Sequence, residues 1–345
     1  MNVEVELLSR KDENEWQEFV RKHPNSCVYH TLEWSRVLES SFSFKNMSII
    51  ARKDGEIAGI MPLFLVKFPF LGKKLISIPF DTEFGGCLCY NNEIGRVMVD
   101  FSKSIARKHG VKYLEIRSAN ELPYCHDFVR KNPVYHTHLT LTSIEDNWNR
   151  IKKNHRVAVK QSQKRGVKTF VTEEKEYLNI LYEEFLKFFR SVASPFYPKR
   201  FFLHIHKLGM LKLVIAEYDE DVIGGSILLY FKDKVIYRFG VAKEEYLKLR
   251  PYNAIIWKCI EWAIQNGFKL MTFGYTYPSQ KGLLKFKEGW GCVSKKSNHY
   301  YYTVNGTVPN FEKQYGKFIF IRRIYKRLPL AVIQPLGGVV RRWVC

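Results

Sequence analysis

The alternation of apolar and polar positions repeats once along the chain. Residues 50–59 (IARKDGEIAG) and residues 215–224 (IAEYDEDVIG) each contain an apolar run, a polar turn at Asp54 or Asp219, and a second apolar run. This pattern predicts a β-hairpin. Because the two segments align without a gap at an offset of 165 residues, we interpret them as two copies of one structural unit.

A second pair of similar segments follows the hairpins. Residues 110–116 (GVKYLEI) match residues 267–273 (GFKLMTF) at an offset of 157 residues. In each copy the glycine is placed to end a helix, because it adopts the left-handed cap conformation without a Cβ clash. Each half therefore predicts a hairpin, a third strand, a helix and a further strand. The third strands are expected at residues 74–79 and 234–242, and the helices at about residues 94–108 and 252–265.

This order of elements resembles the GNAT acyltransferase fold, and it predicts an α/β (α+β) protein built as a tandem duplication of that fold. In GNAT proteins, strands separate beside a central hairpin and the acyl donor occupies the opening. Their usual R/Q-x-x-G-x-G/A loop binds pyrophosphate through backbone N–H groups. The corresponding residues 249–254 (LRPYNA) contain no glycine, although a helix start still favours an anion.

Several short stretches also follow one another in a family-like order. They are residues 28–34 (VYHTLEW), 59–63 (GIMPL), 77–80 (SIPF) with Gly85 and Gly86 after them, and 282–291 (GLLKFKEGWG). Between about residue 10 and residue 305, this order resembles the Fem family (FemAB-like peptidoglycan bridge-forming aminoacyltransferases) and the related BioF2-like acetyltransferases of the GNAT superfamily. The most specific stretch is the last, which is similar to the Fem segment G-L-x-x-F-K-x-G-F-G.

The resemblance implies two GNAT-like domains, at residues 1–140 and 141–310, with the second one catalytic and entered by a basic helix at 143–166. A basic amphipathic tail would follow at 311–345. Fem proteins transfer an amino acid from aminoacyl-tRNA to an amine of a peptidoglycan precursor. Many tRNA-using members carry a long helical arm that this chain lacks. We therefore expect no bound cofactor and an acyl donor that is either aminoacyl-tRNA or acyl-CoA.

Acyl transfer to an amine needs a neutral amine, a polarised carbonyl and close alignment of the two. Lys287 is our candidate cation for stabilising the oxyanion, with Lys285 as the alternate. Two residues apart, these lysines would share a face on a strand. Asp81 could accept a proton or orient the amine. The alternatives are solvated lysines and an aspartate that only shapes a turn.

The candidate substrate-binding residues are mostly aromatic. Arg238 lies within an apolar strand, where it could clamp a phosphate or carboxylate or form a structural ion pair. The others could line a groove or be ordinary packing residues. They are Trp34, Tyr197, Tyr252, Asn253 and Tyr275.

The formal net charge of +21 indicates an anionic partner. Residues 150–168 and residues 313–345 each contain eight lysines or arginines and no acid. The first segment could contact the phosphates of tRNA or of a nucleotide-linked precursor, or be a solvated helix face. The second could lie on an anionic membrane, or pack on the domain as a C-terminal helix.

Neither the cysteines nor the histidines form a metal-binding pattern. The seven cysteines include no C-x-x-C pair, and the H-x-H pairs His136/His138 and His204/His206 lack a neighbouring ligand cluster. The scattered thiols suggest a reducing compartment. The first residues do not resemble a signal peptide, and no run of about 18 apolar residues occurs. We therefore expect no metal and a cytoplasmic location, peripheral to the inner face of the membrane.

The sequence favours an enzyme that transfers an acyl or aminoacyl group directly to an amine of a cell-envelope precursor, in peptidoglycan or envelope glycan synthesis. The precursor would be lipid- or nucleotide-linked, and the reaction would take place at the cytoplasmic membrane face. One alternative is a CoA-dependent N-acyltransferase of an amino sugar. Another is a non-catalytic module that binds RNA or anionic lipid.

Overall fold

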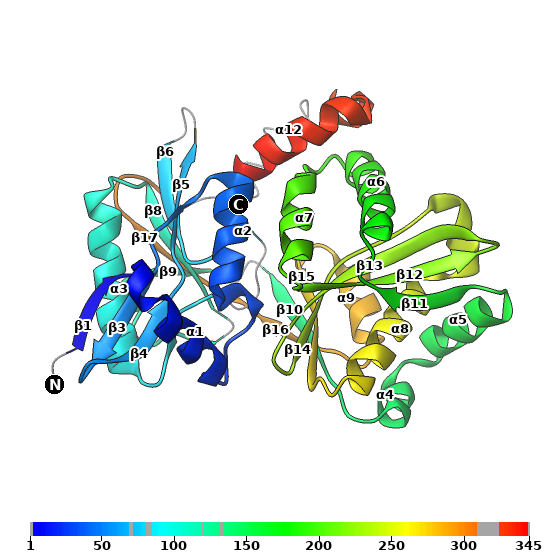
Figure 1. Ribbon diagram of the computed structural model, residues 1–345, viewed down its shortest axis with the longest axis horizontal. Helices are drawn as coiled ribbons and strands as arrows, with labels where there is room; N and C mark the ends of the chain where they lie inside the picture. The colour runs from blue at the N-terminus through cyan, green and yellow to red at the C-terminus, as the bar shows by residue number, and fades with distance from the viewer. Residues whose placement is uncertain are drawn as a thin grey trace. The chain divides into compact units, whose positions relative to one another are not determined.

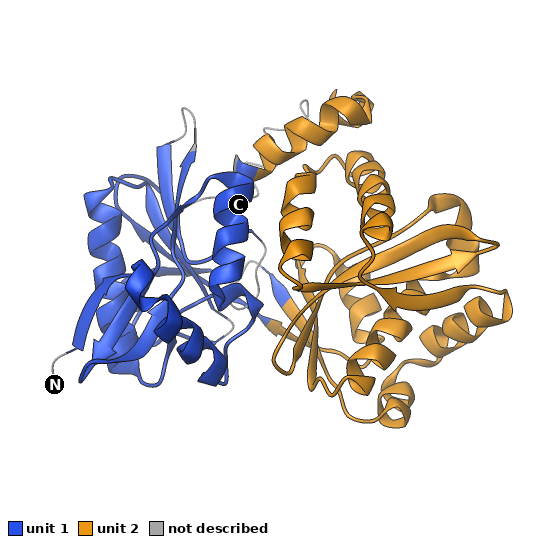
Figure 2. Cartoon of the chain, viewed as in Figure 1, with its two compact units in different colours: residues 1–135, 296–316, 342–345 blue, residues 136–295, 317–341 orange. Residues whose placement is uncertain are grey.

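The computed structural model describes residues 3–68, 72–80, 85–118, 120–131, 134–308 and 324–343. The chain forms two compact units, which Figure 2 colours separately. Unit 1 comprises residues 1–135, 296–316 and 342–345, and unit 2 comprises residues 136–295 and 317–341. The sequence analysis placed residues 296–310 in the second domain, whereas the structure assigns them to unit 1.

Unit 1 contains two sheets. The first has the order β1-β3-β4-β7, and its strands are β1 (Val3–Leu7), β3 (Ile49–Lys53), β4 (Glu56–Met61) and β7 (Leu88–Cys89). The second has the order β2-β5-β6-β8-β17-β9, with β2 (Lys45–Asn46), β5 (Phe64–Phe68), β6 (Gly72–Ile76), β8 (Tyr113–Ser118), β17 (Asn298–Thr303) and β9 (Val129–Lys131). Its helices are η1 (Arg10–Asp12), α1 (Glu13–Lys22), η2 (Val28–His30), α2 (Leu32–Phe42) and α3 (Asn92–Lys108).

The core of unit 1 forms where α3 packs against β1, β3, β4, β7 and β8. The Asn91 side chain caps α3 by accepting a hydrogen bond from the Ile94 backbone N–H at 3.0 Å. Ile94, Met98 and Ile105 recur at helical spacing, so α3 presents one apolar face to the sheets. This helix corresponds to the one expected at residues 94–108.

Unit 2 is built on one seven-stranded sheet with the order β11-β12-β13-β14-β15-β10-β16. The strands are β11 (Lys168–Thr172), β12 (Leu211–Tyr218), β13 (Asp221–Phe231), β14 (Lys234–Ala242), β15 (Leu270–Thr276), β10 (Tyr135–Thr140) and β16 (Val293–Lys296). The helices are α4 (Ile144–Arg150), α5 (Lys153–Lys164), α6 (Lys175–Ser191), α7 (Lys199–Lys207), η3 (Glu244–Leu249), α8 (Pro251–Gln265) and α9 (Lys281–Glu288), with the C-terminal α12 (Leu330–Trp343) after them. Helices α6 and α7 lie on one face of the sheet and α8 on the other (Figure 1).

The two predicted hairpins are the structural repeat. In β3–β4, Ala51 pairs with Gly59 and the register shifts after Ala51; in β12–β13, Ala216 pairs with Gly224 and the register shifts after Ala216. These bulges lie 165 residues apart, at equivalent positions of the two copies. Both turns also have two consecutive residues with positive φ, at Asp54–Gly55 and Asp219–Glu220, as a two-residue hairpin turn requires. The duplication predicted from the sequence is therefore confirmed.

Each unit contains a parallel strand pair with a short contact. In unit 2, β14 and β15 pair only from Lys234–Leu270 to Ile236–Thr272, although both strands continue beyond that point. In unit 1, β6 and β8 pair only at Leu75–Leu114 and Ile76–Glu115. The early end of the β14–β15 pairing agrees with the strand separation that the GNAT resemblance implied.

In each unit, one sheet contains a strand from the other half of the sequence. The strand β17 pairs antiparallel with β8 in unit 1. The strand β10, which follows β8 and β9 in the chain, instead lies next to β15 in unit 2. Because of this exchange, a single boundary near residue 140 cannot divide the chain into its two units.

None of the described helices is long and apolar enough to cross a lipid bilayer.

Candidate active site

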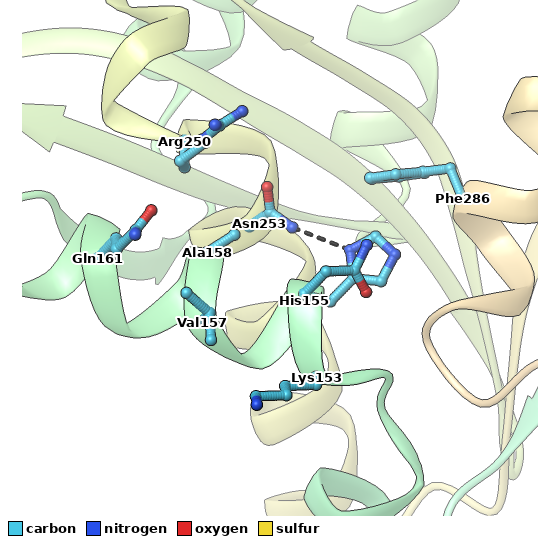
Figure 3. Close-up of a pocket in the computed structure, with 9 residues that line it drawn as sticks. Lys153, His155, Val157, Ala158, Gln161, Arg250, Asn253 and Phe286 are labelled. Carbon is cyan, nitrogen blue, oxygen red and sulfur yellow. Dashed lines mark hydrogen bonds between the residues drawn. The ribbon is translucent and has the colours of Figure 1, made fainter.

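A pocket of about 740 Å³ opens in unit 2 where the N-terminal ends of α5 and α8 meet α9 (Figure 3). Helix α5 contributes most of the lining, and α8 and α9 contribute the rest. The lining residues are Lys153, Asn154, His155, Val157, Ala158, Gln161, Arg250, Asn253 and Phe286. Of the residues that the sequence analysis singled out, Asn253 lies in this pocket.

The start of α8 lies in the stretch that replaces the glycine-containing loop of GNAT proteins. Arg250 adopts a left-handed conformation with φ of 62°, and Pro251 follows at the first helical position. The left-handed conformation is unusual for a residue with a Cβ atom. Neither α5 nor α8 has a side-chain cap, but the N–H groups of His155 and Asn253 donate to the Lys152 and Arg250 carbonyls, and Pro251 has no N–H. Among the described hydrogen bonds, the N–H groups of Lys153, Asn154 and Tyr252 have no acceptor and are the donors at the pocket. Two helix starts and the side chains of Lys153 and Arg250 make this pocket attractive to an anion.

His155 joins α5 to both other helices of the pocket. Its Nδ1 accepts a hydrogen bond from the Asn253 amide at 3.1 Å (Figure 3), and its ring also hydrogen-bonds to the Phe286 carbonyl. The ring packs 4.9 Å from both the Phe286 and the Trp290 rings. Burial, assisted by the charge of Lys152, lowers the pKa of His155, so the ring is neutral at pH 7. The amide donor on Nδ1 and the carbonyl acceptor favour the tautomer protonated at Nε2.

The sequence analysis did not single out His155. A signal was nevertheless present, because His155, Val159 and Ser162 are the buried positions of α5 and recur at helical spacing. A histidine on the buried stripe of an otherwise basic helix is expected to have specific partners.

Lys285 and Lys287 lie on helix α9, not on a strand, so the expectation that they share a face is wrong. Positions two residues apart on a helix point about 200° apart around its axis. Lys285 is exposed, whereas Lys287 is buried and its Nζ donates to the Tyr275 carbonyl of β15 at 3.0 Å. The structure therefore brings Lys287 and Tyr275 together, directly after Phe286 of the pocket wall.

Arg238 and Tyr197 form a second cluster, which does not line the pocket. The Tyr197 hydroxyl accepts hydrogen bonds from Arg238 at 2.7 Å and from Arg341 of α12 at 2.9 Å. The Arg238 guanidinium also lies 4.8 Å from the Phe239 ring centroid. Tyr197 is buried and stacks on Phe201. The two predicted residues therefore occur together, within an aromatic cluster of unit 2.

The remaining predicted residues have structural contacts or lie outside the described residues. The Tyr252 hydroxyl accepts a hydrogen bond from the Ala242 backbone N–H at 3.2 Å and so ties α8 to β14, and burial raises its pKa. Trp34 is fully buried in unit 1, with its ring 4.9 Å from that of Tyr29, so it packs in a core and does not line an open groove. Asp81 lies outside the described residues.

The basic segment predicted as one helix at residues 143–166 is two helices. The Ser143 side chain caps α4, which ends at Arg150, and Ile151 is extended before α5 begins at Lys153. The Lys152 backbone N–H then donates to the Gly289 carbonyl, which fixes the break beside the pocket. Four cations recur on one face of α5, and within the described parts of the chain none of them forms an ion pair. They are Lys153, Arg156, Lys160 and Lys164.

Among the residues that the structure describes, no three His, Cys, Asp or Glu side chains lie close enough together to hold a metal ion. His204 and His206 lie on helix α7, where a spacing of two residues does not place them on one face.

Comparison with known proteins identifies the class of the second unit. Residues 149–287 match the family model described as an acetyltransferase (GNAT) domain. The segment includes the pocket, Arg238 and Lys287. No curated protein sequence matches the chain.

Solved structures share the tandem fold. One is FemX, with a TM-score of 0.71 and 15% identity, covering 92% of this chain and 100% of that chain. Another is the C-terminal domain of a putative lysylphosphatidylglycerol synthetase from Agrobacterium fabrum, with a TM-score of 0.60 and 12% identity, covering 84% and 91%. A third is a tandem GNAT protein from the clavulanic acid biosynthesis pathway, with a TM-score of 0.52 and 11% identity, covering 89% and 100%.

The resemblance to Fem proteins is therefore confirmed at the level of the fold, and so is the expected class of enzyme. Residues 149–287 match the acetyltransferase (GNAT) domain, in a chain that has the tandem fold of FemX.

Proposed function

We propose that this protein transfers an aminoacyl group from aminoacyl-tRNA to an amine of a cell-envelope precursor. The observations that carry the proposal are the pocket at the starts of α5 and α8, which Lys153 lines, and the row of cations along α5, which form no ion pair within the described residues. The shared fold with FemX and with the lysylphosphatidylglycerol synthetase domain supports an aminoacyl donor and an envelope acceptor.

The charge distribution on α5 favours a polyanion over a compact anion. Lys153 stands in the first turn of the helix, which contains no acid, although the helix dipole favours acids there. The cations continue from Lys153 to Lys164, about 16 Å along the helix axis. A pyrophosphate needs only the two helix starts, whereas a nucleic acid strand also neutralises the rest of this face.

In this proposal the amine attacks the aminoacyl ester directly. The bond from the carbonyl carbon to the ribose oxygen breaks, and the new amide bond forms on the same carbon. Lys287 supplies positive charge to the developing oxyanion, and the proton that the amine loses goes to the ribose oxygen that leaves. Arg238 holds an anionic group of the acceptor, which is a lipid- or nucleotide-linked precursor at the cytoplasmic face of the membrane.

Binding to tRNA tests the donor. Wild-type protein should bind a tRNA whose 3′-aminoacyl link is a stable amide. The variant Lys160→Glu/Lys164→Glu should bind it at least tenfold more weakly, with a shallower salt dependence because two phosphate contacts are lost. The charge-matched variant Lys45→Glu/Lys108→Glu, in unit 1, should bind within twofold of wild type. Equal binding by wild type and the α5 variant would refute the assigned donor surface.

The start of α8 also supports a second candidate, a CoA-dependent N-acyltransferase of an amino sugar. In the sequence it corresponds to the loop with which GNAT proteins bind pyrophosphate, and a helix start favours an anion. Saturable binding of acetyl-CoA, with acetyl transfer to an amino sugar and no transfer from aminoacyl-tRNA, would establish this candidate in place of the first. Binding of RNA without turnover of either donor would instead indicate a non-catalytic module.

A further inference from the structure

One face of helix α12 packs on unit 2. Ile333 is buried, and Gly337 lies so close to the loop before α7 that an added Cβ would stand 3.2 Å from the Phe196 carbonyl oxygen. Arg341, one turn further along, is 8% exposed and donates to the Tyr197 hydroxyl. Residues 333, 337 and 341 recur every four positions, so they form one face of the helix.

A different face of α12 carries an apolar stripe in contact with solvent. Val332, Leu336 and Val339 are 38%, 41% and 50% exposed. Their spacing of four and three residues aligns them along the helix. Another face of α12 already packs on the domain, so this stripe takes no part in that packing. Its exposure to water is unfavourable unless a further apolar phase covers the stripe.

Further exposed apolar residues lie next to the loop on which α12 packs. Phe188 is 40% exposed in the last turns of α6, and Val192 is 39% exposed at the C-cap. The loop that follows carries Phe196 and Pro198, which contact Gly337 and Gly338 of α12. Figure 1 shows α12 alongside this end of α6 and α7. The exposed residues Val332, Leu336, Val339, Phe188 and Val192 are called the α12 surface below.

The charges of α12 and of the residues before it are of one sign. Residues 324–343 contain Lys326, Arg327, Arg341 and Arg342 and no acid. Lys326 and Arg327 are exposed at the approach to α12. Apolar side chains flanked by cations are the pattern of a surface that lies on a bilayer with anionic headgroups.

We propose that the α12 surface docks on an anionic lipid bilayer, with the apolar stripe among the acyl chains and the cations at the headgroups. A second copy of the chain fits poorly as the occupant, because each copy carries a formal net charge of +21 and would present the same cations. The contacts of Ile333, Gly337 and Arg341 then attach the acyltransferase domain to the membrane through the opposite part of the helix. This inference deepens the membrane location of the proposed function but does not depend on the donor or on turnover.

Co-sedimentation of the full-length protein with vesicles tests the proposal. We expect binding to vesicles of 30 mol% phosphatidylglycerol in phosphatidylcholine, and at least tenfold weaker binding to pure phosphatidylcholine. The variant Val332→Gln/Leu336→Gln/Val339→Gln should lose at least tenfold in partition coefficient. The control Ile180→Gln replaces an equally exposed apolar residue of α6 and should bind as wild type does.

Three results would overturn the proposal. The first is binding of the triple variant equal to that of wild type, and the second is equal binding to neutral and anionic vesicles. The third is a shift from dimer to monomer in the triple variant without lipid, measured by light scattering, which would mean that a second copy covers the surface. Because tRNA binding is measured without vesicles, failure of either proposal can be recognised separately.

Discussion

The Asn253 side-chain amide donates a hydrogen bond to Nδ1 of His155 over 3.1 Å, and this bond joins the starts of α8 and α5 at the wall of the pocket. Asn253 belongs to the stretch that replaces the glycine loop of typical GNAT proteins. Typical GNAT proteins have glycines in this stretch. This chain instead has Asn253 there, and its side chain helps to hold the two helix starts in place.

Replacement of Asn253 by leucine should destabilise the protein and weaken donor binding. The change keeps the side-chain size but leaves the buried Nδ1 of His155 without its donor, at an expected cost of about 1–3 kcal/mol in the free energy of unfolding. Urea unfolding measures the loss. The control is Asn154→Ala, an exposed residue of the same pocket, which should stay within about 0.5 kcal/mol of wild type. Equal stability of Asn253→Leu and wild type would contradict this role of the hydrogen bond.

Gly289 is needed because of His155. A Cβ added at Gly289 would lie 2.2 Å from Nε2 of His155, so Gly289→Ala must displace the ring that Asn253 and Phe286 hold. We expect Gly289→Ala to lower the free energy of unfolding by about 1–3 kcal/mol. In a His155→Ala background, Gly289→Ala should lower the free energy of unfolding by less than it does in the wild-type background, because the clash with the histidine ring is absent. An additive double mutant would argue against the steric explanation.

Gly282→Ala is the matched control for Gly289→Ala on the same helix. No atom lies within 4 Å of a Cβ at Gly282, so the alanine should be neutral or stabilising by up to about 1 kcal/mol through its higher helix propensity.

Lys287→Ala should lower turnover at least 100-fold while the far-ultraviolet circular dichroism stays unchanged. Lys287 is buried and held at the Tyr275 carbonyl, whereas Lys285 on the same helix is exposed. The variant Lys285→Ala should therefore keep turnover within about twofold, because a solvated lysine at this position loses little on truncation. Equal effects of the two substitutions on turnover would exclude the role proposed for Lys287.

Glu115 of β8 should stabilise unit 1 in a pH-dependent manner. Burial alone would raise its pKa, but Arg117 at 2.8 Å, together with His299, holds the pKa well below the ordinary value of 4.5. Its contribution to stability is therefore complete above about pH 4.5 and decreases as the pH falls towards the lowered pKa.

Glu115→Gln leaves Arg117 buried without its carboxylate, at an expected cost of about 3 kcal/mol at pH 7. The difference in unfolding free energy between wild type and variant should shrink between pH 5 and pH 3. Glu18→Gln removes an exposed ion pair with Lys22 and should leave both the stability and its pH dependence unchanged. A difference that does not vary with pH would show that folding does not lower the pKa of Glu115.

The hairpins and the helices after them could be predicted from the sequence because their signals are local. The turn residues, the alternation of apolar positions and the glycine at each helix end specify these elements within a few residues of chain. Lys287 and Asn253 were also singled out from their sequence context, since both lie in stretches that the GNAT and Fem resemblance indicates, and the structure places Asn253 in the pocket.

The two wrong predictions of secondary structure, at residues 285–287 and at residues 143–166, have a common cause. Residues 281–288 contain alternating lysines that suit a strand, but packing of Phe286 and Lys287 against His155 and Tyr275 favours a helix. The predicted helix at 143–166 breaks at Ile151 because Lys152 is held by the Gly289 carbonyl. In both cases the deciding partner lies more than 10 residues away in the sequence, so local propensity could not reveal it.

The sequence by itself determined the repeated unit, the class of fold and the concentration of positive charge in two segments, because each depends on residues that are neighbours in the chain. Only the tertiary structure decided the exchange of β10 and β17 between the units, the His155–Asn253 contact and the division of α12 into a packed face and an exposed one. Strand pairing and side-chain burial depend on which distant segments come together, and a local pattern of apolar and polar residues is compatible with more than one such partner.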